Sequence, residues 1–140
     1  MVSLYGTNKL YLISCNLYRK QMNLKALVVD DDHNIRGVFT ELLQLAKFDV
    51  IGTGSDGKEA VEMYQKLHPD VVFIDAMMPK YDGFYGVEKI KEYDPDAVIV
   101  MVTGSINVDE RLEQCKATAV LPKPIDIDKI ISVTSKFCVH

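Results

Sequence analysis

Five short apolar runs, separated by helical patterns, set the main constraint on how this chain folds. The runs cover residues 24–29, 49–53, 71–74, 97–102 and 118–121. Between them, residues 34–47, 58–67, 83–93 and 108–115 carry apolar side chains at the three- and four-residue spacing of a helix. Strands that alternate with helices in this way are typical of βαβ units. The sequence therefore predicts an α/β fold around a parallel sheet.

Residue types at the ends and faces of the helices refine this prediction. Asn34 is a candidate N-cap for the first helix, and either Asp126 or Asp128 begins the last one. The helix over residues 108–115 has few apolar anchors, Val108 and Leu112, so we expect it to be the least stable element. The inner face of the first helix is expected to carry Ile35, Val38, Phe39, Leu42, Leu45 and Ala46.

Length, charge and cysteine content limit the domain count and the class of partner. The chain has 140 residues, enough for one domain with a single substantial core. Its formal net charge of -4 offers no sequence-wide basic surface, so we expect no direct binding to nucleic acid. Cys15, Cys115 and Cys138 are an odd number with no close pair, which argues against a disulfide framework or a zinc site. Such cysteines favour a reducing compartment, and we expect a cytoplasmic protein.

The first 22 residues do not share the alternating pattern. We expect residues 1–22 to be an N-terminal extension, either disordered or the product of a start that is not the natural one, because Met22 directly precedes the first patterned run. Residues 23–140 would then form the domain. The uncharged run over residues 10–18 is too short to span a membrane, and the region before Cys15 lacks the apolar stretch of a secretion signal.

Polar residues follow four of the apolar runs, at points that a parallel sheet brings to one edge. Asp30 and Asp31 follow the first run, and Asp75 follows the third. Thr103 follows the fourth run, and Lys123 comes shortly after the fifth. Ligands of open parallel sheets bind beyond the carboxyl ends of the strands, and an acid directly after a buried strand loses hydration. We therefore interpret the three acids, the hydroxyl and the ammonium group as one site.

Four short motifs together resemble the receiver domain of two-component response regulators. They are Val28-Val29-Asp30-Asp31-Asp32 with Arg36 beyond it, Asp75-Ala76-Met77-Met78-Pro79 leading to Asp82-Gly83, Val102-Thr103-Gly104, and Lys123-Pro124. The resemblance spans residues 24–137 and is to the small stand-alone kind, such as chemotaxis and sporulation receivers. It implies a doubly wound, flavodoxin-like (βα)5 fold with five parallel strands in the order 2-1-3-4-5. It also implies a cis peptide bond before Pro124.

The resemblance implies a role for each acid of the site. Asp75 would accept a phosphoryl group from a phosphohistidine on a sensor histidine kinase or a phosphotransfer protein. Asp31, Asp75 and the backbone carbonyl of Met77 would bind Mg²⁺, and Asp30 would act largely through a metal-bound water. Such oxygen ligands are the ones that Mg²⁺ prefers. The chain would catalyse only its own phosphorylation and dephosphorylation, so it would not be an enzyme with a separate substrate.

Thr103 and Lys123 complete the implied machinery. Lys123 would neutralise charge on the phosphoryl oxygens. Thr103 would move toward one of those oxygens and so couple the new charge to the fourth strand and to the helix after it. The altered surface would then bind a downstream protein. By analogy with the family, that protein binds the face of the fourth helix, fifth strand and fifth helix, including Val120 and Ile127.

Several positions depart from the family pattern. Val120 stands where the family usually has Tyr or Phe, so the switch would run on backbone and packing shifts, or the output surface would differ. Lys116 replaces a common Gly, and Pro122 is unusual at its position. Met77 and Ser105 occupy the two positions that flank the phosphoryl group in this family and set how easily water attacks it.

Two other functions are open as alternatives. A phosphohydrolase of the haloacid dehalogenase type also uses an Asp nucleophile and Mg²⁺, but that family places a second Asp two residues later, where this chain has Met77. A receiver-like interaction module that acts without phosphorylation has the absence of an aromatic residue at Val120 as its support. Because all five polar residues of the site are present, we expect a receiver that is phosphorylated.

Overall fold

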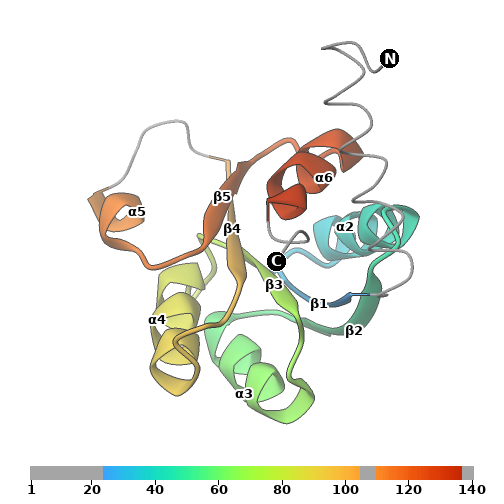
Figure 1. Ribbon diagram of the computed structural model, residues 1–140. Helices are drawn as coiled ribbons and strands as arrows, with labels where there is room; N and C mark the ends of the chain where they lie inside the picture. The colour runs from blue at the N-terminus through green and yellow to red at the C-terminus, as the bar shows by residue number, and fades with distance from the viewer. Residues whose placement is uncertain (1–23, 105–109, 137–140) are drawn as a thin grey trace, which may run out of the picture.

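One parallel sheet with helices on both faces forms the domain (Figure 1). The computed structural model describes residues 24–104 and 110–136. In chain order the elements are β1 (Lys25–Val29), α2 (His33–Leu45), β2 (Asp49–Gly54), α3 (Gly57–Leu67), β3 (Val71–Asp75), α4 (Gly83–Tyr93), β4 (Ile99–Thr103), α5 (Glu110–Gln114), β5 (Ala119–Pro122) and α6 (Ile127–Ser135). The five strands are parallel and lie in the order β2-β1-β3-β4-β5. The predicted fold class and strand order are confirmed.

The helices form two layers. In Figure 1, α2 and α6 lie together on one face of the sheet and α3 and α4 on the other, with α5 beside the β4–β5 side. Successive residues of a strand point to opposite faces. In β1, Leu27 and Val29 therefore pack in the core under α3 and α4, whereas Ala26 and Val28 pack in the core under α2 and α6. Each face of the sheet thus has its own apolar core.

Burial on both faces explains why the strands are near-continuous apolar runs. Every residue of β3 and of β4 is buried, as expected for parallel strands between two helix layers. The predicted runs match all five strands, with boundaries that differ by no more than two residues; β4, for example, begins at Ile99 rather than residue 97. Within the described part of the chain, β5 pairs with β4 alone and is an edge strand, a position that tolerates Pro122.

The prediction for the first helix was wrong in two details. Its N-cap is Asp32 rather than Asn34, because the Asp32 carboxylate accepts hydrogen bonds from the backbone N–H groups of Asn34 and Ile35. Val38 is 58% exposed and Leu45 is 67% exposed, so neither belongs to the inner face. Phe39 and Leu43 are the buried residues of α2. Successive residues of a helix are about 100° apart around its axis. When Phe39 and Leu43 face the sheet, Val38 and Leu45 therefore lie on the outer side of α2.

The other helix predictions are confirmed with small changes. Asp126 is the N-cap of α6, and its carboxylate accepts a hydrogen bond from the Lys129 N–H at 2.8 Å. The predicted helix over residues 108–115 is the five-residue α5, in which no residue is buried. The Lys123–Pro124 peptide bond is cis. Val108 and the predicted N-terminal extension, residues 1–22, lie outside the described residues.

None of the helices in the described ranges is both long and apolar enough to cross a lipid bilayer.

Candidate functional site

Asp30 lies just beyond the carboxyl end of β1 and is held by the backbone around it. The residue is 3% exposed, and its Oδ1 accepts a hydrogen bond from the backbone N–H of Asp32 at 2.8 Å. The Asp30 N–H donates to the Gly54 carbonyl at 3.0 Å, and Arg36 Nη1 donates to the Asp30 carbonyl at 2.8 Å. These bonds fix the residue between β2 and the start of α2.

Asp75 is the last residue of β3, the central strand of the sheet. It is 7% exposed and has β1 and β4 as the neighbouring strands. Its Oδ1 accepts a hydrogen bond from the backbone N–H of Met77 at 3.3 Å. The N–H of the next residue, Ala76, donates to the Val102 carbonyl at 2.8 Å. The carboxylate is therefore held at the middle of the sheet edge.

The connection from β3 to α4 closes tightly behind Asp75. The Gly83 N–H donates to the Ala76 carbonyl at 3.0 Å. A Cβ atom at Gly83 would clash with the Asp75 carbonyl oxygen, so glycine is what allows this close approach. Asp82 caps α4 by accepting a hydrogen bond from the Tyr85 N–H at 2.9 Å. The start of α4 is thereby placed against the end of β3.

Three carboxylates and one ammonium group come together at this edge. Carboxylate oxygens of Asp30, Asp31 and Asp75 lie within 4.8 Å of one another. Lys123 Nζ lies 3.4 Å from Asp75 Oδ2 and 3.8 Å from Asp30 Oδ2. Four of the five residues singled out in the sequence therefore lie in one cluster.

The fifth residue, Thr103, ends the neighbouring strand β4. It is 6% exposed, and its carbonyl accepts the backbone N–H of Lys123 at 2.8 Å. Because Asp75 is paired with Val102 across the sheet, Thr103 lies one residue beyond the partner of Asp75. The hydroxyl-bearing residue and the lysine are thus fixed to the same edge as the acids.

Burial raises the pKa of the two central carboxyl groups. Desolvation is the main cause for Asp30, and the hydrogen bond from the Asp32 N–H opposes it in part. Desolvation also raises the pKa of Asp75, and the positive charge of Lys123 opposes it in part. A raised carboxyl pKa means that the negative charge is less favourable here than in water. A cation among these oxygens would offset that cost.

The oxygen donors suit a hard divalent cation. Mg²⁺ takes oxygen ligands, accepts few of them from the protein and keeps the rest as waters or phosphate oxygens. Asp30, Asp31 and Asp75 each offer one carboxylate oxygen within the cluster. The residues therefore fit Mg²⁺, with the Met77 carbonyl as the further ligand that the family resemblance implies.

Contacts made by Arg111 near the site were not foreseen from the sequence. Arg111 lies on α5, and its Nη1 is 3.2 Å from Asp82 Oδ2 while its Nη2 is 3.8 Å from Met77 Sδ. Met77 itself is 61% exposed. An arginine on a short polar helix gives no local signal of what it contacts, because the partners are 29 and 34 residues away.

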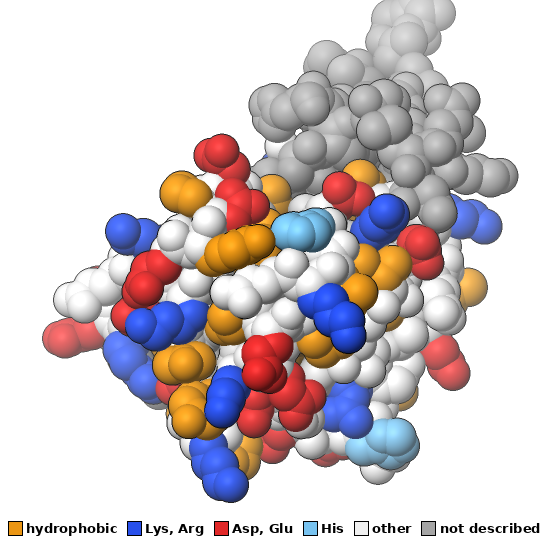
Figure 2. Space-filling model, turned by 90° about the horizontal axis from the view of Figure 1, so that it is seen from below, with side chains coloured by type: hydrophobic (Ala, Val, Ile, Leu, Met, Phe, Trp, Pro, Cys, Tyr) orange, Lys and Arg blue, Asp and Glu red, His pale blue; other side chains and the backbone are white. Residues whose placement is uncertain are grey.

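Among the described residues, Asp30, Asp31 and Asp75 form the one group of three acidic, histidine or cysteine side chains that offer ligand atoms within 4.8 Å of one another. On the face that Figure 2 shows, several acidic side chains of the described residues gather near the centre, with basic side chains on either side of them and apolar ones around. Opposite charges mixed over short distances largely cancel each other's field. The acids at the strand ends differ because two of the three are buried and all three share one small volume.

Comparison with known proteins gives one consistent result. The family described as response regulator receiver domain matches residues 26–135. The chemotaxis protein CheY of Thermotoga maritima is 30% identical over 117 residues, which are 82% of this chain and 98% of that protein. CheY of Halobacterium salinarum is 33% identical over 117 residues, 81% of this chain and 96% of that one. Among solved structures, the CheX-CheY-BeF3-Mg complex of Borrelia burgdorferi matches with a TM-score of 0.74 and 30% identity, over 81% of this chain and 89% of that one.

Replacing either buried acid with asparagine should stabilise the metal-free protein. Carboxylates within 4.8 Å of each other repel by about 3 kcal/mol at an effective dielectric constant of about 20. Lys123 and water offset part of this, so we expect Asp30→Asn and Asp75→Asn each to raise the free energy of unfolding by about 1–2 kcal/mol. Thermal melts in excess chelator measure the change.

Asp49→Asn is the matched control, because Asp49 is an exposed acid at the start of β2. It should change the free energy of unfolding by less than about 0.5 kcal/mol. Destabilisation by both Asp30→Asn and Asp75→Asn would show that the acids do not repel each other as described.

Proposed function

This chain belongs to the response regulator receiver domain family of two-component signalling, and from that premise we propose that it accepts a phosphoryl group on Asp75. The donor is a phosphohistidine on a sensor histidine kinase or a phosphotransfer protein, and the cofactor is Mg²⁺. Phosphorylation then changes which downstream protein the domain binds.

The grouping of acids around a lysine is the observation that supports this proposal most. Asp75 ends the central strand and is the acid closest to Lys123, at 3.4 Å. Asp30 and Asp31 follow β1 and have oxygens within 4.8 Å of Asp75. Phosphoryl transfer requires positioning and charge neutralisation more than covalent chemistry. A nucleophilic carboxylate flanked by a lysine and two metal-binding acids meets both needs.

The proposed step is a displacement at phosphorus. A carboxylate oxygen of Asp75 forms a bond to phosphorus while the P–N bond to the donor imidazole breaks. The electron pair of that bond stays on the imidazole nitrogen, and Asp75 becomes an acyl phosphate. Lys123 neutralises part of the charge on the transferred oxygens. Mg²⁺, when bound by Asp30, Asp31 and Asp75, supplies further charge neutralisation.

Met77 and Thr103 have supporting roles in this proposal. The Met77 backbone carbonyl would be a metal ligand, and this role is supported by the hydrogen bond from the Met77 N–H to Asp75 Oδ1 at 3.3 Å. The Thr103 hydroxyl binds a phosphoryl oxygen, and its placement is supported by the position of Thr103 at the end of β4, next to β3. Phosphorylation of Asp75 would therefore change the contacts of both residues and, through them, the segments that follow each one.

Incubation with acetyl phosphate and Mg²⁺, followed by intact mass measurement, tests this function. Acetyl phosphate donates its phosphoryl group to a carboxylate and leaves as acetate. We expect one phosphoryl group on the unmodified protein and none on Asp75→Asn, because Asp30 and Asp31 are placed to hold metal. Excess chelator should abolish labelling, since the incoming phosphate would otherwise meet three carboxylates.

The controls separate this function from its alternatives. Asp49→Asn should be labelled as the unmodified protein is, because Asp49 lies at the far end of β2. A phosphoryl group that persists on Asp75→Asn, or equal labelling in chelator, would contradict the assigned site. A chain that is never labelled would instead favour an interaction module that acts without phosphate.

An apolar depression lies beside the site. Ile35, Val38 and Leu42 of α2 face Pro124 and Ile125 across a mainly apolar depression of about 290 Å³, which Lys123 also lines. A donor protein must bring its phosphohistidine to Asp75 and will cover the nearest surface as it does so. We propose that it packs on this depression, because exposed apolar side chains gain most from being covered.

The downstream partner is assigned to a different face. We propose that it binds across α5, β5 and α6, as the family resemblance implies. Val120 on β5 is 43% exposed, whereas Ile127 is half-buried and packs against the core. Val120 is therefore the more accessible of the two residues named for this surface.

Val38→Ser should slow phosphoryl transfer from a histidine kinase but not from acetyl phosphate. Loss of an apolar contact of about 1.4 kcal/mol corresponds to a rate about tenfold lower. Transfer from a panel of autophosphorylated kinases, compared with acetyl phosphate labelling, measures the difference. Leu45→Ser is the control, since Leu45 is equally apolar and 67% exposed but does not line the depression.

Val120→Ser should leave transfer from both donors unchanged, because Val120 is assigned to the downstream partner. Equal effects of Val38→Ser and Leu45→Ser would argue against a donor surface on this part of α2.

A further inference from the structure

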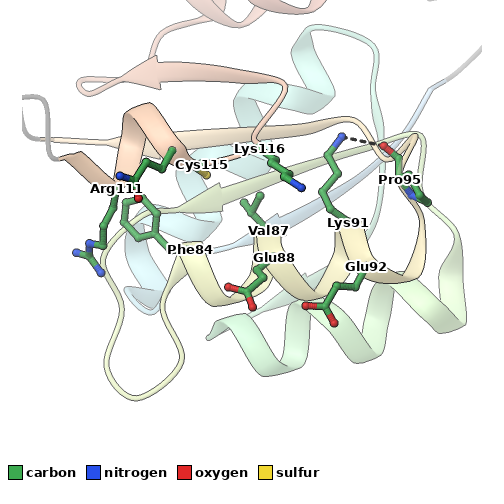
Figure 3. Close-up of a pocket in the computed structure, with 10 residues that line it drawn as sticks. Phe84, Val87, Glu88, Lys91, Glu92, Pro95, Arg111, Cys115 and Lys116 are labelled. Carbon is green, nitrogen blue, oxygen red and sulfur yellow. Dashed lines mark hydrogen bonds between the residues drawn. The ribbon is translucent and has the colours of Figure 1, made fainter.

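Arg111 of α5 contacts both ends of the connection between β3 and α4. Its Nη2 lies 3.8 Å from Met77 Sδ, near the start of the connection, and its Nη1 lies 3.2 Å from Asp82 Oδ2, at the end. The guanidinium carbon lies 4.3 Å from the centre of the Phe84 ring. Figure 3 shows Arg111 and Phe84 side by side at one end of the groove between α4 and α5. One side chain thus holds α5 to the segment that follows Asp75.

The position of α5 depends on such contacts. The helix has five residues, none of them buried, and Leu112 is the one that packs against the apolar core. A helix of this length is not stable by itself. A groove of about 800 Å³ runs between α4 and the segment from α5 to Lys116. The contacts of Arg111 therefore add to the packing of Leu112 in holding α5 near α4.

The same connection is bonded to the acidic site. The Met77 N–H donates to Asp75 Oδ1 at 3.3 Å, so a group that binds or modifies this oxygen competes with the bond. The Met77 thioether is in contact with Arg111, and the Asp82 carboxylate that pairs with Arg111 also caps α4. Contacts therefore run from the Asp75 carboxylate through Met77 and Arg111 to α5.

We propose that Arg111 is a positioning residue that couples occupancy of the acidic site to the position of α5. This inference rests on the proposed function, because it requires Mg²⁺ and a phosphoryl group at Asp75. Val120 stands in place of the aromatic residue that the family resemblance leads one to expect. Arg111 gives this chain another route from the site to its surface, through its contact with Met77 and its ion pair with Asp82. We expect occupancy of the site to stabilise the position of α5 against α4. Because such coupling is reciprocal, releasing α5 then weakens binding at the acidic site by the same factor.

The test measures two properties of the full chain. One is the affinity for Mg²⁺, by calorimetry. The other is amide hydrogen exchange over residues 110–117, before and after addition of Mg²⁺ with beryllium fluoride, which mimics a phosphoryl group on a carboxylate. In the unmodified protein, we expect the exchange to slow on addition. In Arg111→Ala, exchange should be fast in both states, and the affinity for Mg²⁺ should fall by about fivefold.

Two further variants test which contact of Arg111 carries the coupling, and a third is a control. Met77→Leu keeps the volume of the side chain but removes the thioether, and should reduce the response of residues 110–117. Arg111→Lys keeps the charge that pairs with Asp82 but loses the planar group, and should restore part of the response. Lys89→Ala is the matched control, because Lys89 forms an exposed ion pair with Glu92 on α4 at 3.6 Å. It should leave both measurements unchanged.

The outcomes distinguish this inference from the function on which it rests. If the unmodified protein responds and Arg111→Ala binds Mg²⁺ as tightly with the same exchange response, the inference is overturned and the function of Asp75 stands. If the unmodified protein neither binds Mg²⁺ nor responds to beryllium fluoride, both are overturned. A melting temperature of Arg111→Ala close to that of the unmodified protein separates lost coupling from unfolding.

Discussion

The placement of buried negative charge at the carboxyl edge of the sheet is the constraint on which the rest of the structure depends. Parallel pairing brings the carboxyl ends of β1, β3, β4 and β5 to one edge of the sheet. Asp30 and Asp75 follow or end neighbouring strands, so their carboxylates lie close together. Their burial raises the pKa of both groups. Lys123 and the backbone N–H groups of Asp32 and Met77 offset part of the cost. A bound cation would offset the remaining cost of burying these two negative charges.

Most of the fold and the central cluster could be predicted from the sequence because both depend on strand ends. A strand covered on both faces must be apolar throughout, as β3 and β4 are, so its limits are visible in the chain. The residue after each run then falls at one edge of the sheet. This local rule located Asp30, Asp31, Asp75, Thr103 and Lys123 without any knowledge of the distances between them.

Two features could not be predicted from the sequence: the rotation of α2 about its own axis, and contacts between exposed side chains. Val38 and Leu45 have the spacing of an inner helix face, but the packing of Phe39 and Leu43 turns α2 so that both are exposed. A helix with apolar residues on both sides has no local signal that selects one of them. The contact of Arg111 with Met77 is of the same kind, since it joins exposed side chains on separate elements. With Val120 at the usual aromatic position, the sequence did not indicate which residues would connect the site with the surface.

The response of the melting temperature to Mg²⁺ tests most directly whether the three carboxylates form one cation site. An ion that binds the folded chain alone stabilises it, by about 1.4 kcal/mol at ten times its dissociation constant. We expect the melting temperature of the unmodified protein to rise through millimolar Mg²⁺, and to rise much less in Asp31→Asn, which removes the exposed acid of the cluster. A melting temperature that does not respond to Mg²⁺, or an equal rise in both proteins, would contradict the claim that these carboxylates form one cation site.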